Sequence, residues 1–399
     1  MKRNSEASKV LWPLCFVAFT SFFSVQTFSQ VITLSEAKLK AEQSSALVQS
    51  ALLELESNRE MEGTAFNLYQ PQLLLQAPTG NFYTIGVQQN FDFPSVYSAR
   101  KSVLKSETDR SEIEAESTKR EVRYKIGDLY IHWQTLESLS DYYGKQQNDF
   151  LEIRNAAVRS FEAGEIDLLE KSFAELKYLE ATRIFGAHKS QRDAVKRSLV
   201  GYLGLLEGAV CDTLGKNMQL VAWSTNAWRS ALVELAMADV KLSEGKFKLL
   251  KRQNLPGFFV GYMNQGERSS AFENRLNAGV SIPLWFWHTG ASKRSAKLIL
   301  EKSQRDLEAV QIEVNQQFQI ATGRHDALVQ SILMMKGESL PLASQLINNA
   351  GRMYEAGEIS LSEYIRMRSD AAQTELSYIQ QLQELLQTQN QLQFITAIQ

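Results

Sequence analysis

Side chains that could catalyse a reaction or bind a metal are few and scattered in this sequence. The four histidines, His132, His188, His288 and His325, lack the mutual spacing of a metal site. There is no glycine-rich phosphate loop and no nucleophile motif, and Cys211 is the single cysteine after the first 30 residues. Acidic residues are numerous, but they lie in helical patterns in which a solvated face is expected. The sequence therefore predicts no enzyme, no cofactor and no metal site.

The most informative polar residues belong to a short motif that occurs twice. Residues 161–168 read Phe-Glu-Ala-Gly-Glu-Ile-Asp-Leu, and residues 354–361 read Tyr-Glu-Ala-Gly-Glu-Ile-Ser-Leu, about half the chain away. Each copy lies between two long charged helical stretches, and glycine can supply the left-handed cap that ends a helix. Each motif therefore predicts the tip of a helical hairpin. One such tip is most simply a well-capped turn, but the same charge in both tips favours a shared role.

Composition indicates which elements position these motifs. The chain has 399 residues, a formal net charge of −2 and only 7 prolines. The mildly acidic net charge gives no indication of nucleic-acid binding. Few prolines together with abundant Leu, Glu, Gln, Lys and Ala favour long helices.

The N-terminal residues predict a secretory signal peptide. Three basic residues precede an apolar run over 10–25, and Thr27-Phe28-Ser29 after it has small residues at the first and third positions of a cleavage signal. The run is broken by Pro13 and is shorter than the roughly 20 apolar residues of a membrane-spanning helix, so an uncleaved anchor is the less favoured alternative. Cys15 lies inside the run without a lipobox, so no lipid anchor is expected.

The predicted elements follow the same order in both halves of the chain. The first half is predicted to contain a helix, two strands, a long helix and a returning helix, at 34–66, 68–77, 82–93, 97–163 and 166–205. The second half is predicted to repeat this order at 228–253, 255–265, 271–283, 290–356 and 359–398. The predicted domain organisation is a signal peptide at 1–29, a first structural repeat at 30–206, a linking segment at 207–226 and a second structural repeat at 227–399.

Both long helices carry apolar residues at alternating steps of four and three. The first seam comprises Val122, Ile126, Leu129, Trp133 and Leu136, and the second comprises Val314, Phe318, Ala321, His325, Leu328, Ile332 and Met335. Such heptads pack helices side by side as coiled coils. A histidine at a seam position is more often a packed polar layer than a metal ligand. At about 1.5 Å per residue each helix is roughly 100 Å long, more than a compact core needs.

The four strand segments, each about 9–12 residues long, have the length that a tilted strand needs to cross a bilayer. Two strand pairs cannot close a barrel alone, and lipid does not tolerate unpaired edges. Three chains would give 12 strands, an even number within the range of outer-membrane barrels. Trp285, Phe286 and Trp287 follow the last strand directly and are predicted to lie at the membrane–water interface.

With these features, the sequence resembles the TolC family of outer-membrane efflux proteins over essentially all of 31–399. The resemblance rests on the order, spacing and duplication of motifs: the helix start (Thr33, Leu34, Glu36, Ala37), the strand entry (Leu255, Pro256), the strand exit (Val280, Ile282, Pro283, Leu284) and the two tips. It implies a fold that is mainly α with a membrane β-barrel: long duplicated coiled-coil helices and four β-strands per chain, closing as a trimeric 12-stranded barrel with an α-helical periplasmic tunnel.

The resemblance also implies function. It describes the channel component of a tripartite efflux system in the cell outer membrane, a homotrimer that docks on a periplasmic adaptor protein and an inner-membrane pump. The implied adaptor-docking residues are Ala163, Gly164, Glu165, Ile166 and Asp167 in the first tip, and Ala356, Gly357, Glu358, Ile359 and Ser360 in the second.

One turn beyond the second tip, the family often places acidic residues that constrict the pore. Glu363 stands at such a position, and Arg366 is basic where a second acid can occur. A solvated helix face is an equally simple interpretation of Glu363. The exported substrate and the class of pump stay open, because the surface loops are brief and the lipobox of many metal-efflux relatives is missing.

A soluble periplasmic coiled-coil adaptor or scaffold is the alternative function. It accounts for the signal peptide and the heptads. It does not account for four strand segments of bilayer length in duplicated places.

Overall fold

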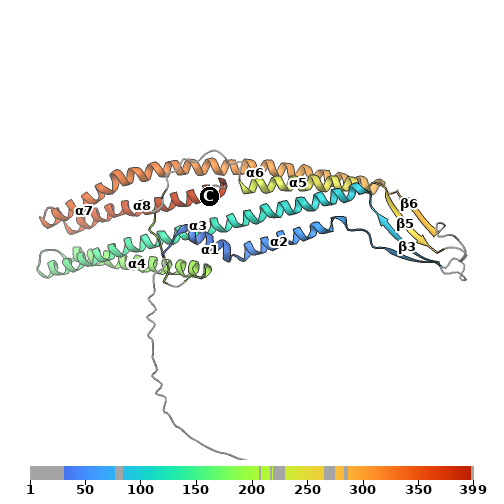
Figure 1. Ribbon diagram of the computed structural model, residues 1–399. Helices are drawn as coiled ribbons and strands as arrows, with labels where there is room; N and C mark the ends of the chain where they lie inside the picture. The colour runs from blue at the N-terminus through green and yellow to red at the C-terminus, as the bar shows by residue number, and fades with distance from the viewer. Residues whose placement is uncertain are drawn as a thin grey trace, which may run out of the picture.

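The chain forms an elongated molecule, with long helices over most of its length and a small β-sheet at one end (Figure 1). The computed structural model describes residues 31–76, 84–205, 208–215, 218, 230–264, 275–282 and 286–396. The predicted signal peptide and the boundaries of the predicted linking segment lie outside these residues and stay predictions.

The elements of the two halves follow one another in the same order. The first half contains α1 (Leu34–Ser44), α2 (Ala46–Glu62), the 3-10 turn η1 (Gly63–Phe66), β2 (Gln72–Gln76), β3 (Thr84–Phe91), α3 (Pro94–Glu162) and α4 (Leu168–Tyr202). The second half contains α5 (Ala231–Arg252), β5 (Gly257–Met263), β6 (Leu276–Ser281), α6 (Phe286–Met334), the π-helical segment η4 (Met335–Ser339), α7 (Leu340–Glu355) and α8 (Leu361–Thr396). Two short strands, β1 (Val31–Ile32) and β4 (Val210–Cys211), pair in parallel. The prediction of a mainly helical chain with four antiparallel strands is confirmed.

The predicted helix 34–66 is wrong as a single element, because Ser45 interrupts it. Ser45 has φ −70° and ψ 120°, which is extended backbone, and its side chain accepts a hydrogen bond from the backbone N–H of Val48. A serine in this conformation caps the helix that follows. At the start of α1, Thr33 and Glu36 of the helix-start motif form a capping box.

The predicted helix 290–356 is also interrupted, at the π-helical segment before α7. Pro341 lies just after this segment, and a proline inside a helix has no N–H to donate and crowds the carbonyl four residues earlier. A widened π turn accommodates this crowding. The helix predicted at 97–163 begins earlier, since Pro94 directly after the predicted strand 82–93 is the first residue of α3, a position where proline is favourable.

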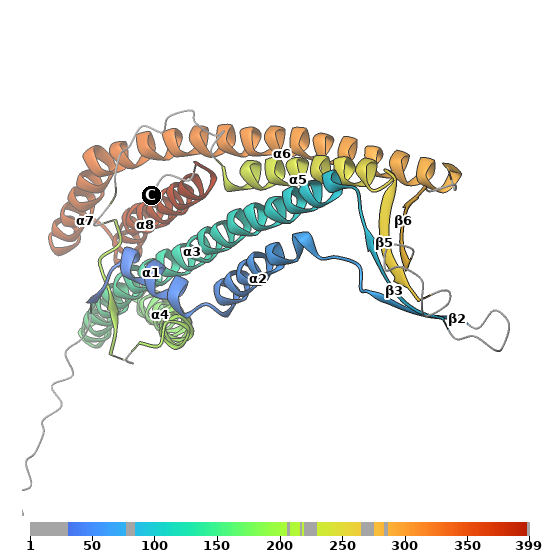
Figure 2. The same ribbon diagram turned by 45° about the vertical axis from the view of Figure 1, so that its right-hand side comes forward.

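Strands β2, β3, β5 and β6 form one antiparallel sheet in that order (Figure 2). The register places apolar residues on one face, since Leu73 pairs with Val87, Val87 with Tyr262 and Tyr262 with Leu276. Leu73 is 67% exposed and Leu276 is 52% exposed. Within the described residues, β2 and β6 each leave one edge unpaired. The sheet therefore presents an apolar face and two open edges.

The described strands are shorter than the predicted 9–12 residues. They contain 5, 8, 7 and 6 residues in the order β2, β3, β5 and β6. At the end nearest the helices, β2 begins at Gln72 rather than at residue 68, and β5 begins at Gly257 rather than at 255. The opposite ends border residues 77–83 and 265–274, which lie outside the described chain.

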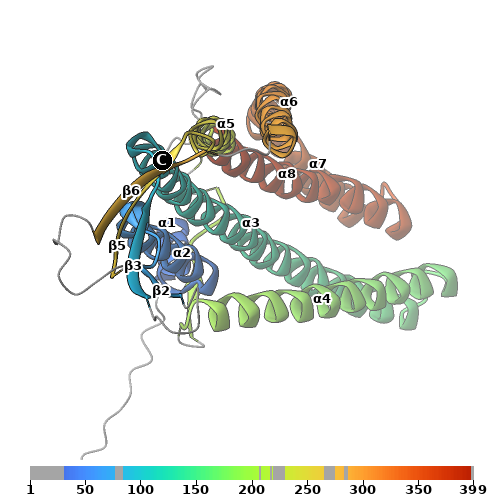
Figure 3. The ribbon, with the colours of Figure 1, turned by 90° about the vertical axis from the view of Figure 1, so that its right-hand side faces the viewer.

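The long helices pack side by side, with equivalent neighbours at both ends of the molecule. Helix α4 and the pair of α7 and α8 lie on opposite sides of α3 (Figure 3). Near the sheet, α2 packs on α3, α3 on α5 and α5 on α6. Away from the sheet, α4 packs on α3, α3 on α8 and α8 on α7. Helix α3 thus joins both groups, while α2 and α4 lie on one edge of the layer and α6 and α7 on the other. None of the described helices contains a stretch long and apolar enough to cross a membrane.

Both predicted heptad seams are buried or half-buried in the helix layer. In the first seam, Trp133 packs in one core with Val122 and Ile126. In the second seam, Val314, Phe318 and Ala321 share one core. Leu328 and Ile332 share another. His325 is buried as a packed polar residue, with Nδ1 lying 3.2 Å from Asp326 Oδ1. Among the described residues no group of three or more His, Cys, Asp or Glu could hold a metal ion.

Candidate functional site: the two hairpin tips

The first tip joins α3 to α4 through a left-handed glycine. Gly164 has φ +79°, and its N–H donates to the Phe161 carbonyl at 3.0 Å. The N–H of Glu165 donates to the Ser160 carbonyl at 2.8 Å. These two bonds form a Schellman motif, which satisfies the last carbonyls of the helix. A Cβ at Gly164 would meet nothing within 4 Å, so the glycine is required by the backbone and not by lack of space.

The second tip, between α7 and α8, repeats this geometry. Gly357 has φ +74°, and its N–H donates to the Tyr354 carbonyl at 3.0 Å. The N–H of Glu358 donates to the Met353 carbonyl at 2.9 Å. The two motifs predicted from the duplicated sequence therefore fold as the same turn.

Each tip ends in a side-chain cap on the next helix. Asp167 Oδ1 accepts a hydrogen bond from the backbone N–H of Glu170 at 2.8 Å. Ser360 Oγ accepts from the backbone N–H of Glu363 at 3.2 Å. Both caps satisfy an otherwise unpaired donor, and an acidic residue in the first turn also interacts favourably with the helix dipole.

The predicted docking residues lie together at the ends of the hairpins, and most of them face solvent. Ile166 and Ile359 are half-buried under their tips. The exposed residues are Ala163, Gly164, Glu165, Asp167, Ala356, Gly357, Glu358 and Ser360.

One polar contact distinguishes the tips. The Glu165 carboxylate accepts a hydrogen bond from Ser160 Oγ at 2.9 Å. The residue equivalent to Ser160 in the second tip is Met353, which has no hydroxyl to donate. Glu165 is therefore held against its own helix, whereas in the described chain no such hydrogen bond holds the carboxylate of Glu358.

The candidate constriction residues lie in the first turns of α8. Glu363 is half-buried and Arg366 is exposed. In the described chain no ion pair joins these two side chains. The arrangement within one chain therefore leaves the charge of Glu363 available at the surface of the second hairpin.

An ion pair that the sequence did not reveal links the two hairpins instead. Arg368 on α8 pairs with Asp149 on α3, and its Nη1 donates to Tyr364 Oη at 3.2 Å. The Arg368 side chain is mostly buried. Beside the pair, a groove of about 430 Å³ separates α3 from α7 and is lined by residues including Lys145 and Ile347. In the sequence Arg368 lies one turn from the apolar residues Ile365 and Ala372, and no pattern there indicates Asp149 as its partner.

The predicted interface aromatics cannot be placed by their side chains. Trp285 lies outside the described residues. Phe286 and Trp287 form the start of α6, for which the structure describes the backbone only. Their position at a membrane interface stays a prediction.

Comparisons with known proteins identify the architecture. No protein-family model and no curated protein matches the sequence. Among solved structures, the chain is similar to the outer-membrane channel OprN, with a TM-score of 0.76 and 10% identity over 91% of this chain and 89% of that one. It is similar to CusC, with a TM-score of 0.76 and 11% identity over 91% of both chains. The Campylobacter jejuni CmeC outer membrane channel has a TM-score of 0.74 and 11% identity, covering 99% of this chain and 94% of that one.

These structures are similar over nearly the full length of both chains, although few residues are identical. The resemblance inferred from ordered motifs and duplicated tips thus agrees with the three-dimensional arrangement. The chain has the fold of the TolC-type outer-membrane channels.

Proposed function

We propose that this chain is one protomer of a trimeric efflux channel in the outer membrane, with its helices extending into the periplasm. The observation that carries the proposal is the sheet, which has an exposed apolar face. Its strands connect directly to helices that are too long for a globular core. An apolar face of this kind is stable when it contacts lipid. The similar solved structures described as outer-membrane channels support the same function. The channel is a passive exit duct without an enzymatic step.

The open sheet edges support a trimer. Backbone groups in lipid must be paired, so β2 of one copy has to meet β6 of the next. Three copies of a four-stranded sheet give about 12 strands, a size found among outer-membrane barrels. Head-to-tail contacts of this kind form a closed ring when the rotation between neighbouring subunits closes.

The edges of the helix layer support the same assembly. On α4, at one edge, Leu169 and Leu176 are exposed, and on α7, at the opposite edge, Leu342 and Leu346 are exposed. Exposed apolar stripes of this kind mark interaction surfaces. In a trimer, α4 of one copy packs against α7 of its neighbour and closes a tunnel.

We infer that the two tips receive a periplasmic adaptor, which connects the channel to an inner-membrane pump. The support is that two separate turns expose the same Gly-Glu pair to solvent, although the backbone hydrogen bonds that form each turn do not involve the glutamate side chain. The docking residues are those named above for the two tips.

We further infer that Glu363 constricts the periplasmic entrance. Three symmetry-related copies of a half-buried glutamate would form a ring of like charge around the axis. Such a ring favours cations over anions in a pore. Arg366 is basic where the family can have a second acidic residue, so a single acidic ring is the simplest arrangement.

Membrane fractionation tests the proposed location against the alternative of a soluble periplasmic adaptor or scaffold. The protein is expected in the outer-membrane fraction, and its migration on a denaturing gel is expected to change on heating, because a closed barrel resists unfolding by detergent. Recovery in the soluble periplasmic fraction, with the same migration before and after heating, would favour the alternative.

A further inference from the structure

Positive charge gathers where α3, α5 and α6 meet the sheet (Figure 2). Segments 94–106 of α3, 245–252 of α5 and 290–300 of α6 contain three, four and three Lys or Arg residues, and none of them contains Asp or Glu. The charge changes sharply along α3, because the next fifteen residues, 107–121, contain six acidic residues. The cations of these three segments are the basic belt, which lies directly beside the sheet.

The two faces of the sheet distinguish two sides of α3. Phe258 lies four residues before Tyr262 in β5 and so shares its apolar face, and Phe91 pairs with Phe258. Successive residues of an extended chain point to opposite faces, so Asp92 points to the other, polar face. Arg100 Nη2 pairs with Asp92 Oδ2 at 2.9 Å. Arg100 therefore marks the side of α3 that continues the polar face.

The opposite side of α3 continues the apolar face of the sheet. Glu107 lies seven residues after Arg100, about two helical turns, and is on the same side. Ser98 lies nine residues before Glu107, about two and a half turns, and is on the opposite side. Arg252 Nη1 on α5 donates to Ser98 Oγ at 3.2 Å. Lys101, nearly one turn after Ser98, is closer to this side than to the side of Arg100.

Cations on the two sides differ in how they are paired. On the polar side, Arg100 has the ion pair described above, and Lys246 on α5 pairs with Glu107 at 2.9 Å. On the apolar side, Lys101 and Arg252 are exposed, and no carboxylate of the described chain pairs with either. The polar side is thus neutralised within the chain, and the apolar side keeps its positive charge.

Lys251 is a third exposed cation without a carboxylate partner among the described residues. It lies five residues after Lys246, about one and a half turns, and so faces away from the paired side. Its Nζ is 4.1 Å from the ring centroid of Phe247, and Lys101 Nζ is 6.0 Å from that of Phe66. Long basic side chains that pack their stems on apolar groups can extend their charge toward a membrane interface.

These cations lie at the depth of lipid headgroups if the apolar face of the sheet contacts lipid. Lys101 is seven residues from Pro94, the first residue of α3, which corresponds to about 10 Å along the helix. Arg252 is five residues before β5 begins at Gly257. The headgroup region extends about 5–8 Å beyond the hydrocarbon core on each side of a bilayer, so both side chains can reach it.

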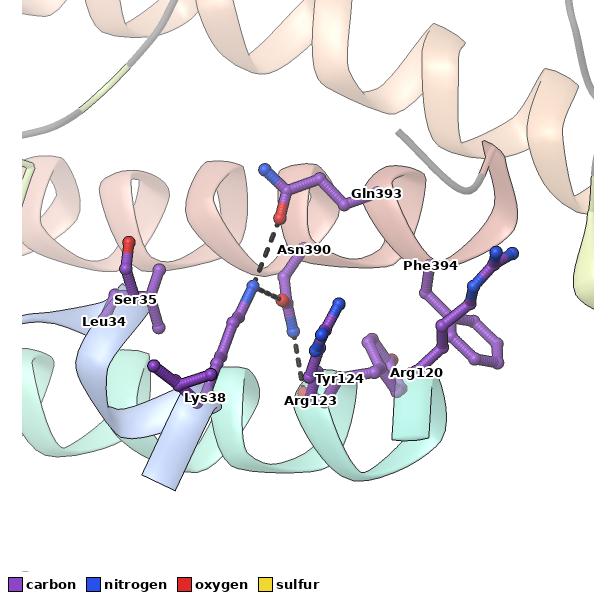
Figure 4. A pocket seen from close by; sticks show the side chains of 10 residues that line it. Leu34, Ser35, Lys38, Arg120, Arg123, Tyr124, Asn390, Gln393 and Phe394 are labelled. Carbon is purple, nitrogen blue, oxygen red and sulfur yellow. Dashed lines mark hydrogen bonds between the residues drawn. The ribbon is translucent and has the colours of Figure 1, made fainter. Parts of the chain in front are cut away.

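Two cations farther from the sheet show the contrasting use of positive charge inside the protein. Lys38 Nζ on α1 donates to Asn390 Oδ1 at 2.7 Å and to Gln393 Oε1 at 3.2 Å (Figure 4). Arg123 Nε donates to Glu42 at 2.6 Å. These side chains join neighbouring helices, whereas the exposed cations of the apolar side are directed away from the protein.

We propose that Lys101, Lys251 and Arg252 bind the phosphate groups of anionic phospholipids in the leaflet nearest the helices. Guanidinium and ammonium groups form charge-assisted hydrogen bonds to phosphate, and basic residues at a membrane surface attract anionic lipid. In a trimer the three cations recur in each copy around the barrel. The inference rests on the proposed function, because it requires the apolar face of the sheet to lie in lipid.

The test uses electron paramagnetic resonance of spin-labelled lipids in vesicles that contain the purified full chain. Lipids in contact with a membrane protein are motionally restricted, so their fraction measures contact and their headgroup dependence measures preference. We expect phosphatidylglycerol to be preferred over phosphatidylcholine by roughly threefold or more, and the preference to weaken in about 1 M salt.

The outcomes separate this inference from the function on which it rests. Restricted lipid without a preference for phosphatidylglycerol would overturn the proposed lipid binding and leave the membrane location intact. An absence of restricted lipid would contradict the membrane location itself, and the inference with it.

Combined variants locate the binding surface. The first variant replaces the three proposed cations by glutamine and should bring the preference close to onefold, with the number of restricted lipids unchanged. The control removes the same charge from three cations that have carboxylate partners, and it should keep the preference. The control substitutions are Lys125→Gln, Lys241→Gln and Lys246→Gln. A preference kept in the first variant, or lost equally in both, would contradict the assignment of the surface.

Discussion

The two hairpin tips share one backbone but lie in different surroundings. Leu168 and Leu361 occupy the same position after their tips, as the first residues of α4 and α8. Leu168 is 62% exposed, whereas Leu361 is 2% exposed. Leu361 packs in a core with Ile365 and with residues of the first hairpin such as Phe150.

This difference shows that the residues of each tip determine its turn, whereas the burial of the helix that follows depends on the rest of the fold. Glycine, the capping side chain and the last helical carbonyls form each tip within a few residues. Burial depends on where the following helix lies: α8 packs on α3 inside the layer, and α4 lies at its edge (Figure 3). Duplication of a short motif thus preserves a shape while its surroundings diverge.

The largest effect is expected from shortening the two equivalent leucines. Leu361→Ala removes a fully buried side chain and should lower the free energy of unfolding by about 2–5 kcal/mol. Leu168→Ala should lower it by less than about 1 kcal/mol, because the side chain is already exposed within its own chain. Loss of helical circular dichroism in denaturant measures both. Similar losses in the two variants would show that the buried and exposed environments are not retained in solution.

Prolines at the tips test whether the two turns are equivalent. Gly164→Pro and Gly357→Pro cannot keep a positive φ and should introduce strain of roughly 1–3 kcal/mol at each tip. Efflux should fail in both variants, while insertion in the outer membrane is kept, because the strands lie at the far end of the molecule. The alanine variants at the same positions, whose Cβ meets no neighbour, should have weaker effects. Loss of outer-membrane insertion would contradict the assigned geometry.

The third comparison concerns the ion pairs of the two hairpins. Arg368→Ala breaks the mostly buried link to Asp149 and should destabilise the contact between α8 and α3 by about 1–3 kcal/mol. Arg154→Ala is the control, since its contact with Glu175 is long, at 3.8 Å, and more exposed. Single-channel recordings in planar bilayers should show higher conductance or longer openings for Arg368→Ala only. Identical recordings for both variants would mean that the link does not hold the hairpins together.

The smallest effects are expected from two equivalent glutamates. Glu170 and Glu363 both follow a capping residue in the first helical turn, so Glu170→Gln and Glu363→Gln should each cost about 0.3–1 kcal/mol of helix stability. Only Glu363→Gln is expected to reduce cation preference in planar bilayers. If selectivity and conductance do not change, Glu363 lies on a solvated outer face and is not part of a constriction.

The sequence predicted the features that depend on local chemistry. The tips, the heptad seams and the four strands were all predictable, because each follows from a short pattern of residues. The start of α3 at Pro94 was missed because proline is compatible both with the end of a strand and with the first turn of a helix. The break at Ser45 was missed because the hydrophobic pattern continues through it.

The long-range contacts could not be predicted. The pair of Arg368 with Asp149 joins helices from different halves, and no spacing in the sequence relates the two residues. The same holds for Lys38 and Asn390, whose contact depends on how α1 and α8 meet across α3. These contacts depend on which helices lie next to one another. A heptad pattern indicates that a helix packs against another helix, but it does not identify that partner.

The most direct test of the central claim is the mass of the detergent-solubilised protein by light scattering. A sheet with two open edges and a helix layer with apolar stripes on both sides should assemble until the edges meet. We predict a single species with the mass of three chains, after correction for bound detergent. A monodisperse monomer would contradict the account, because it would leave the strand edges unpaired in lipid.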